Sequence, residues 1–207
     1  MVTLTFLALA GLLGAVHATP VTVLPRDSDE DLLRYLTQSN PDSIVFHTAP
    51  GMPTLEELNI TVTDFFKPEF RAKHGLPDPR NKSPLPDRNI VEKRSDPVCW
   101  GVDQVTMTHI NAAYACRDYL SSFGNTRCVA TGIPTELCVL EANYYQCITR
   151  GTANGVGTAA STCADIVRGI YWIIDNCRTN DPCRCGVAGA NAAWGNGDLI
   201  ISVKSAG

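Results

Sequence analysis

Cysteine is absent from the first 98 residues, although the chain contains nine cysteines in all. All nine lie between Cys99 and Cys185. The absence excludes a disulfide framework in the N-terminal part, whereas the dense group that follows is typical of one. Because nine is odd, we expect one thiol to stay unpaired or to pair between two chains. The cysteine pattern therefore divides the chain into two parts.

Charged side chains are absent before Arg26, and Leu4–Ala15 is almost entirely apolar. Val16-His17-Ala18 then places small residues where a signal peptidase cuts. The apolar stretch is shorter than the ~20 residues that span a bilayer. We therefore assign residues 1–18 to a secretory signal peptide, the alternative being a buried apolar helix. No second long apolar stretch follows, so we predict a secreted, extracellular protein without a membrane span.

Signatures of catalysis are absent from the cysteine-containing part of the chain, the residues that follow Arg94. Metalloprotease, nucleophile-elbow and P-loop motifs do not occur, and His109, the one histidine in this part, is expected to pack in the core. Asp165 and Asp175 are ten residues apart and do not form a preset acid–base pair. Seven Lys and Arg accompany nine Asp and Glu, with no basic run that favours nucleic acid. We predict no catalysis, cofactor or nucleic-acid partner.

Zinc is the alternative use of the last cysteines. Cys177, Cys183 and Cys185 are close in sequence, and His109 offers a fourth ligand. Zinc sites, however, favour matched pairs separated by about two to four residues. Secretion also favours oxidation of cysteine. We therefore predict disulfides rather than a metal site.

Residues 19–94 hold ten of the 17 Lys and Arg of the chain. Leu76–Asn89 contains four prolines among charged residues, which indicates an extended linker. Ser28–Asp31 and Thr54–Glu57 resemble N-terminal capping boxes and predict two short helices. We expect this part of the chain to be largely disordered.

The dibasic pair Lys93-Arg94 directly precedes Ser95, at the boundary in composition. It resembles the processing site of fungal propeptides that kexin-type proteases cut. We therefore predict a propeptide at residues 19–94 and a mature cysteine-rich domain at residues 95–207; the alternative is a permanent disordered arm. A mature domain of 113 residues has a thin core, which disulfides offset by about 2–4 kcal/mol each.

Apolar periodicity predicts the elements of the mature domain. Helical spacing indicates helices at about residues 103–121 and 162–177. Strands are predicted at 127–130, 138–149 and 199–203, and loops at 152–158 and 186–197. No strand–helix–strand unit repeats, so we predict an α+β fold, a small disulfide-rich α/β sandwich in which two main helices pack an antiparallel sheet.

A family resemblance runs through this domain, carried in order by "CWGVDQVTMTHINAAYAC", "YYQCITRG", "TCADIVRGIYWIIDNC", "CRCG" and "WGNGDLIISVK". In cysteine spacing and element order, the stretch from Cys99 to Val203 resembles the type-four killer toxins of smut fungi and their secreted fungal relatives. The resemblance implies a five-stranded antiparallel sheet packed by helices. Fungal glycan-binding and effector proteins with similar small folds remain alternatives.

The disulfide pairing is taken from the resemblance, which implies bridges joining Cys99 to Cys185, Cys116 to Cys163, and Cys128 to Cys147. The family's two other bridges use cysteines that this chain lacks. Cys177 is then left to pair with the added Cys183, and Cys138 keeps the free thiol. These last roles remain exchangeable, because sequence does not fix connectivity.

The activity that the resemblance implies is arrest of susceptible fungi by interference with calcium uptake at channels, without catalysis. A basic residue just before the cysteine matching Cys138 is important to that activity, and Glu136 stands there in this chain. An acidic channel mouth would attract a cation but repel a carboxylate. The remaining cations are Arg150, Arg178, Arg184 and Lys204, of which the last three are our candidates for target binding; ordinary solvated surface charge is the alternative.

Three hypotheses about function follow. The first is a secreted toxin-like or effector protein that binds a cell-surface target, a channel-like protein or a glycan, on a competing or host cell. The second is a carbohydrate-binding module with an aromatic stacking platform drawn from Trp100, Tyr144, Tyr145, Tyr171, Trp172 and Trp194. The third is an enzyme whose site forms only in three dimensions.

Overall fold

A computed structural model describes residues 44–76, 96–101, 107–142, 145–179 and 186–205 of the chain. The predicted signal peptide, the Lys93-Arg94 site and Arg184 lie outside the described residues. The elements in chain order are β1 (Ile44–Thr48), the 3₁₀ helix η2 (Val62–Phe66), α2 (Pro68–Lys73), β2 (Val98–Cys99), β3 (Thr108–His109), α3 (Ile110–Ser121), β4 (Arg127–Thr131), β5 (Thr135–Ala142), β6 (Tyr145–Ala153), β7 (Thr158–Thr162), α4 (Cys163–Asn176), β8 (Gly186–Val187), β9 (Gly189–Ala193) and β10 (Asn196–Lys204).

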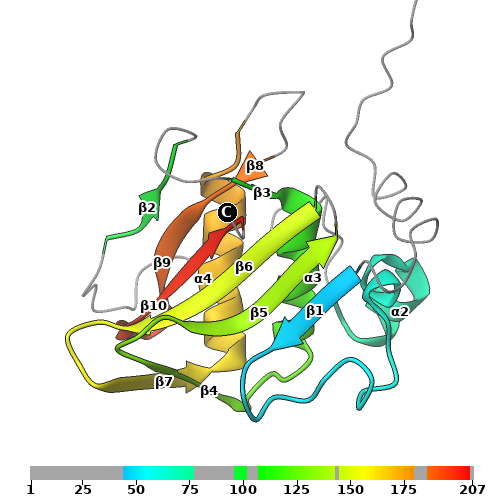
Figure 1. Cartoon of the computed structure of the whole chain (residues 1–207), viewed down its shortest axis with the longest axis horizontal. Helices are drawn as coiled ribbons and strands as arrows, with labels where there is room; N and C mark the ends of the chain where they lie inside the picture. The colour runs from blue at the N-terminus through cyan, green and yellow to red at the C-terminus, as the bar shows by residue number, and fades with distance from the viewer. Residues whose placement is uncertain (1–43, 77–95, 102–106, 143–144, 180–185, 206–207) are drawn as a thin grey trace, which may run out of the picture.

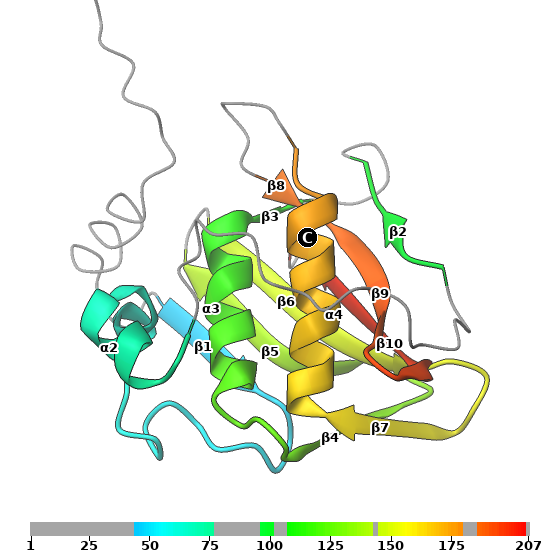
Figure 2. The ribbon, with the colours of Figure 1, turned by 180° about the vertical axis from the view of Figure 1, so that it is seen from behind.

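An antiparallel sheet of six described strands, in the order β1-β5-β6-β10-β9-β2, carries the core. Helices α3 and α4 lie side by side against one face of it, as two opposite views show (Figures 1 and 2). Along β10, Leu199, Ile201 and Val203 are buried and their neighbours are less so, because alternate residues of a strand face opposite sides. The predicted α+β fold is confirmed, and β4 and β7 form a separate two-stranded ribbon.

Helix α4 matches its prediction closely. Its N-cap is Thr162, whose hydroxyl accepts a hydrogen bond from the Asp165 amide at 3.1 Å. This bond satisfies one of the amides that a helix leaves unpaired at its start. The side chains of Ile166, Ile170 and Ile173 are fully buried. The apolar stripe read from the sequence is therefore the face that packs on the sheet.

Helix α3 begins at Ile110, later than predicted. The ring Nδ1 of His109 accepts a hydrogen bond from the Asn111 amide at 3.3 Å and caps the helix. Thr108 and His109 themselves pair with β8 as strand β3. Part of the predicted helix, residues 103–106, lies outside the described residues. His109 thus ends a short strand and starts a helix, a role that its apolar spacing alone does not indicate.

One strand prediction and one loop prediction are wrong. The stretch predicted as one strand at 138–149 is split between β5 and β6, which pair antiparallel with Ala142 opposite Tyr145. The predicted loop at 186–197 instead contains β8, β9 and the start of β10. Its small residues permit close packing: a Cβ on Gly189 would lie 2.7 Å from the Val98 carbonyl oxygen and 2.9 Å from the Cys177 sulfur. The small residues that made this stretch resemble a loop instead let α4 and β2 pack closely on β9.

The disulfide pairing also differs from the one that the resemblance implies. The three described bridges are Cys99–Cys177, Cys116–Cys138 and Cys128–Cys163. Cys163 begins α4 two residues after Ser161, which is paired with Cys128 across the β4–β7 ribbon. This proximity explains why Cys128 bonds to Cys163 and not to Cys147. Cys183 and Cys185, which were predicted to pair with Cys177 and Cys99, lie outside the described residues.

Cys147, and not Cys138, is the free thiol among the described cysteines. It lies in the middle of the sheet, opposite Leu140, and is fully buried. Burial raises the pKa of the Cys147 thiol to about 12. The thiolate is the reactive form of cysteine, so this side chain is inert at neutral pH in the folded protein.

Replacing Cys147 distinguishes the disulfide pairing of the structure from the pairing that the resemblance implies. In Cys147→Ala, the number of thiols alkylated in denaturant without reductant should fall by one, because the residue removed carries a free thiol. Alkylation of the native wild-type protein should leave Cys147 unmodified, which peptide mass mapping would show. A rise of one thiol in the variant would contradict the structure, because it would mean that Cys128 had lost its partner.

Candidate interaction site

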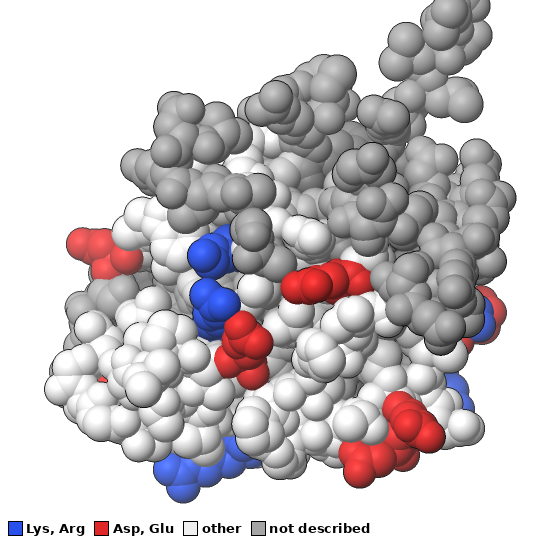
Figure 3. All heavy atoms as spheres, in the orientation of Figure 1, with Lys and Arg blue, Asp and Glu red and all other residues white. Residues whose placement is uncertain are grey.

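Of the three cations predicted to bind a target, the structure describes two, Arg178 and Lys204, which come from different elements. Arg178 follows the C-cap of α4 and forms an isolated backbone bridge with Val187. Lys204 lies at the end of β10, on the sheet face turned away from the helices. Arg184 is outside the described residues. Figure 3 shows the described Lys and Arg of the outer sheet face in small groups among Asp and Glu, without a broad basic surface.

Arg150 has a specific partner on this outer face. Its guanidinium Nη2 lies 2.9 Å from a carboxylate oxygen of Glu136, across the paired strands β5 and β6. Glu136 occupies the position at which the resemblance implies a positively charged residue. Its carboxylate offsets the charge of Arg150, so the pair presents little net charge to a target.

Of the aromatic residues proposed as a sugar-stacking platform, Tyr171 and Trp172 lie on α4, while Trp194 and Trp100 bond to the backbone near or beyond its two ends. The Trp194 amide donates to the Asp165 carbonyl in the first turn of α4. The Trp100 amide donates to the Ala188 carbonyl, beyond the opposite end of that helix. Tyr171 is buried, and Trp172 is half-buried against the core. A helix rises ~1.5 Å per residue, so the two outer tryptophans cannot share one platform. Tyr144 and the side chain of Tyr145 lie outside the described part of the chain.

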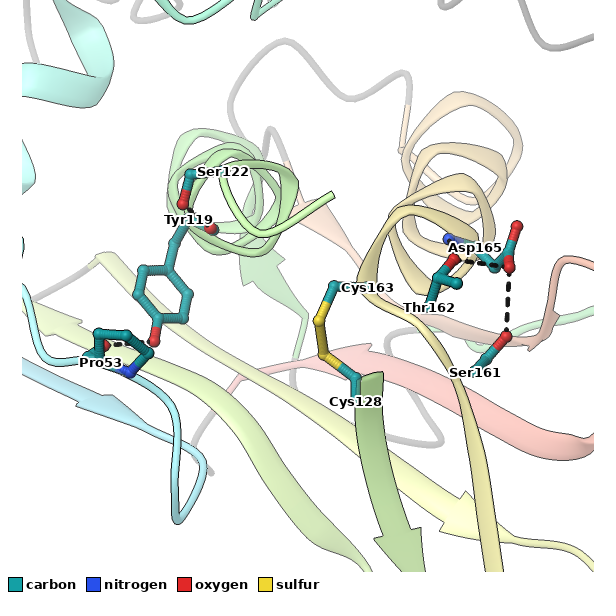
Figure 4. Close-up of a disulfide and its surroundings, with 8 residues drawn as sticks. All are labelled: Pro53, Tyr119, Ser122, Cys128, Ser161, Thr162, Cys163 and Asp165. Atoms are coloured by element: carbon teal, nitrogen blue, oxygen red, sulfur yellow. Dashed lines mark hydrogen bonds between the residues drawn. A yellow bond between two sulfur atoms is a disulfide. The ribbon is translucent and has the colours of Figure 1, made fainter. Parts of the chain in front are cut away.

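No metal-binding group of three or more His, Cys, Asp or Glu is found among the described residues. Of the two acids considered for acid–base work, Asp165 has a structural role. The Asp165 carboxylate accepts hydrogen bonds from Thr162 at 2.6 Å and from Ser161 at 3.4 Å, and forms an ion pair with Arg168. These contacts hold the start of α4 (Figure 4). They place Asp165 in a helix cap.

Residues 44–76, here called the N-terminal segment, form the largest interaction that the sequence did not predict. The segment belongs to the predicted propeptide, yet it is ordered and packs against the cysteine-rich domain. Strand β1 extends the sheet by pairing antiparallel with β5, from Ile44 opposite Ala142 to Thr48 opposite Cys138. Both views place β1 and α2 beside β5 and α3 (Figures 1 and 2). The expected disorder therefore does not extend to this segment.

Apolar side chains of the N-terminal segment enter the core of the domain. Phe65 is fully buried, and Val62, Phe66 and Leu76 are at most 7% exposed. They form one hydrophobic cluster with residues of α3 and of the sheet. The Phe46 ring packs edge-on against Tyr119 of α3, with ring centroids 5.2 Å apart. Such pairs add specific geometry to the area that they bury.

A buried ion cluster joins the same two parts. The Asp118 carboxylate on α3 is fully buried; its Oδ1 accepts from Arg117 Nε at 2.6 Å and its Oδ2 from Arg71 Nη1 at 2.5 Å. Arg71, on α2, also donates to the Phe65 carbonyl at 2.7 Å. The guanidinium of Arg117 lies over the rings of Tyr114 and Tyr171, at 4.6 and 4.8 Å from their centroids. The cluster therefore links α2, α3 and α4, the last through the contact of Arg117 with Tyr171.

Electrostatics explain why this carboxylate needs two partners. Burial raises the pKa of the Asp118 carboxyl, and the charges of Arg117 and Arg71 oppose that rise. An ionised group out of water is costly unless it is paired and hydrogen-bonded. The N-terminal segment supplies Arg71 as the second partner. The Asp118 carboxylate therefore has both of its charged hydrogen-bond donors only when this segment is folded onto the domain.

A hydrogen bond from Tyr119 completes the contact. Its hydroxyl donates to the Pro53 carbonyl at 2.6 Å, reaching from α3 to the loop after β1 (Figure 4). Burial raises the pKa of Tyr119 to about 12, so the hydroxyl keeps its proton at neutral pH. The turn that follows carries the predicted capping contacts, with the Thr54 amide donating to the Glu57 carboxylate at 2.7 Å, but no helix is assigned there.

Sequence signals for the N-terminal segment were present. Ile44–Thr48 is a short β-branched and aromatic run, and Pro68 stands at the first position of α2, where proline is favoured. Val62, Phe65 and Phe66 have helical spacing. Only the partner surface on the domain was not visible in the sequence.

Replacing Asp118 by alanine should destabilise the precursor by about 3–5 kcal/mol, because two guanidiniums then stay buried without their carboxylate. The free energy of unfolding in urea measures this. Glu136→Ala is the control: its pair with Arg150 is exposed and contributes less than about 1 kcal/mol. Equal losses in the two variants would contradict the central role of Asp118.

Comparisons with known proteins identify a family but no activity. No curated protein and no solved structure matches the chain. A family model described as "Domain of unknown function (DUF8794)" matches residues 95–205, more than half of the 207 residues. The match starts at Ser95, directly after Lys93-Arg94, and leaves out the N-terminal segment. The chain therefore belongs to the family described as Domain of unknown function (DUF8794).

Proposed function

We propose that this chain is a secreted precursor, that a kexin-type protease cuts it after Arg94, and that the disulfide-stapled domain following the cut binds a cell-surface target. The domain consists of residues 95–207 and acts on competing or host cells as a toxin-like or effector protein. The observation that carries the proposal is the agreement of two independent boundaries. The dibasic pair ends at Arg94, and the family match begins at Ser95.

The disulfides support the same division. All three described bridges join residues within 95–207, and no cysteine precedes Cys99. Cleavage after Arg94 would therefore leave every described bridge intact. Disulfides persist in oxidising compartments, which supports secretion. No described helix has the length and apolar character needed to cross a membrane.

The mode of action that we favour is binding rather than catalysis. The sequence after Arg94 offers no clustered nucleophile, base and acid, and the described carboxylates of Asp118 and Asp165 serve the core and a helix cap. A calcium channel is the target that the resemblance suggests. The Glu136–Arg150 ion pair counts against a channel target, because the Glu136 carboxylate cancels positive charge at the position where a cation would be needed.

Secretion from a kexin-competent fungal host should yield a product that begins at Ser95, as its intact mass after reduction would show. Changing the site to Lys93→Gln with Arg94→Gln should leave a product that begins near Thr19, which serves as the control. A wild-type product beginning near Thr19 would contradict the proposed processing.

The processed protein should inhibit growth of some fungal or plant cells at micromolar concentration, and the same protein after reduction and alkylation should not. Calcium uptake measured on the sensitive cells distinguishes a channel target from another surface protein, and binding to a glycan array identifies a sugar target. Absence of any effect or binding across these assays would overturn the proposed function.

Charge reversal at Glu136 tests the channel target directly. Glu136→Lys frees Arg150 and places two cations together, so it should strengthen the block of calcium uptake in sensitive cells. Glu136→Gln removes the carboxylate without reversing its charge and should have a smaller effect. Both changes lie at an exposed pair and should alter the free energy of unfolding by less than about 1 kcal/mol. Equal potency of all three proteins would exclude a channel mouth that reads charge at this position.

A further inference from the structure

The N-terminal segment, residues 44–76, contributes a strand to the main sheet and buried side chains to the core. We propose that it stays bound after cleavage at Arg94, so that the mature protein is a non-covalent assembly of two chains. The interaction surface on the domain is the edge of β5 together with Asp118 and Tyr119 of α3, and its partner is the processed segment. The inference rests on the proposed processing and adds what happens to the product.

The first support is burial. Phe65 is as deeply buried as Leu120 of α3, and both are fully inaccessible to solvent. Phe65 also packs against Phe46 and Phe70, with centroids 6.3 and 5.8 Å apart. Separation would expose these rings together with the surface of Tyr119 that contacts Phe46. Exposing apolar surface to water is unfavourable, and the peptide bond that the protease cuts contributes nothing to these contacts.

The second support is the sheet edge. Strand β5 pairs with β6 on one side and with β1 on the other. Without β1 it would become an edge of eight residues, Thr135–Ala142, whose burial pattern has one exposed position, Glu136. Long apolar edges are templates for pairing with other chains. Retention of β1 keeps this edge covered in the secreted product.

The third support is the ion cluster. Arg71 is buried with its guanidinium on Asp118 and on the Phe65 carbonyl. Removing the segment would take one of the two guanidiniums from the buried carboxylate, leaving Arg117 alone to compensate it. Truncating one member of a buried, hydrogen-bonded charge pair raises the rate of dissociation. The cluster therefore slows departure of the segment.

The bond between the two chains would be non-covalent, because the first 98 residues contain no cysteine. A denaturant should therefore separate the chains, while native conditions should not. This difference gives the inference a direct test on the whole precursor.

The experiment cleaves the purified precursor, without its signal peptide, with a kexin-type protease in vitro. Denaturing mass spectrometry verifies cleavage at Arg94, and native mass spectrometry and gel filtration then report whether the chains remain together. We expect one native species that contains both chains and that separates in urea. Elution of the N-terminal chain apart from the domain immediately after cleavage would overturn the inference. Because cleavage is performed and verified in vitro, this result does not depend on whether cells process the precursor.

Variants then locate the cause of retention. Arg71→Ala and Phe65→Ala should each increase the dissociation constant of the cleaved pair roughly tenfold or more, since each removes a buried contact. Lys73→Ala is the matched control, because Lys73 is an exposed cation on the same helix and should change the constant less than about twofold. The uncut variants verify the fold, because the linker tethers the segment. Equal dissociation constants for the Arg71→Ala, Phe65→Ala and Lys73→Ala variants would contradict a role for the buried contacts.

Discussion

The buried carboxylate of Asp118 is the contact on which the arrangement of the chain depends. It accepts hydrogen bonds from Arg117 of its own helix and from Arg71 of the N-terminal segment. Since a charge out of water requires partners, the segment, α3 and the rings beside Arg117 are fixed by one group. The apolar cluster around Phe65 and the β1–β5 ladder then enclose it. The charge cluster sets which parts meet, and the apolar contacts supply most of the buried surface.

Two kinds of linkage hold the protein together, and they divide it along the family boundary. The three described disulfides lie within residues 95–207 and restrict the unfolded chain of that domain. The N-terminal segment is held by packing, one strand ladder and buried polar contacts. A cut between the two parts leaves both kinds of linkage in place. The described structure is therefore compatible with maturation that changes the covalent chain without dismantling the fold.

Features encoded locally were predictable from the sequence, and features that depend on distant partners were not. Helix α4 follows from its apolar stripe and from Thr162, and β10 follows from alternation at Leu199, Ile201 and Val203. The sequence predicts a loop at β9 because its one glycine and three alanines reflect close packing against α4 and not local strand propensity. The pairing of Cys128 with Cys163 depends on the β4–β7 register. The candidate site was missed for the same reason: Asp118 gives no sign in the sequence of its partner Arg71.

Hydrogen exchange along the uncut precursor would test most directly whether the N-terminal segment belongs to the folded unit. We expect the amides of β1 in the ladder with β5, and those of α2, to exchange as slowly as the amides of α3. Exchange of residues 44–76 at the rate of unstructured chain, alongside a protected cysteine-rich domain, would contradict it.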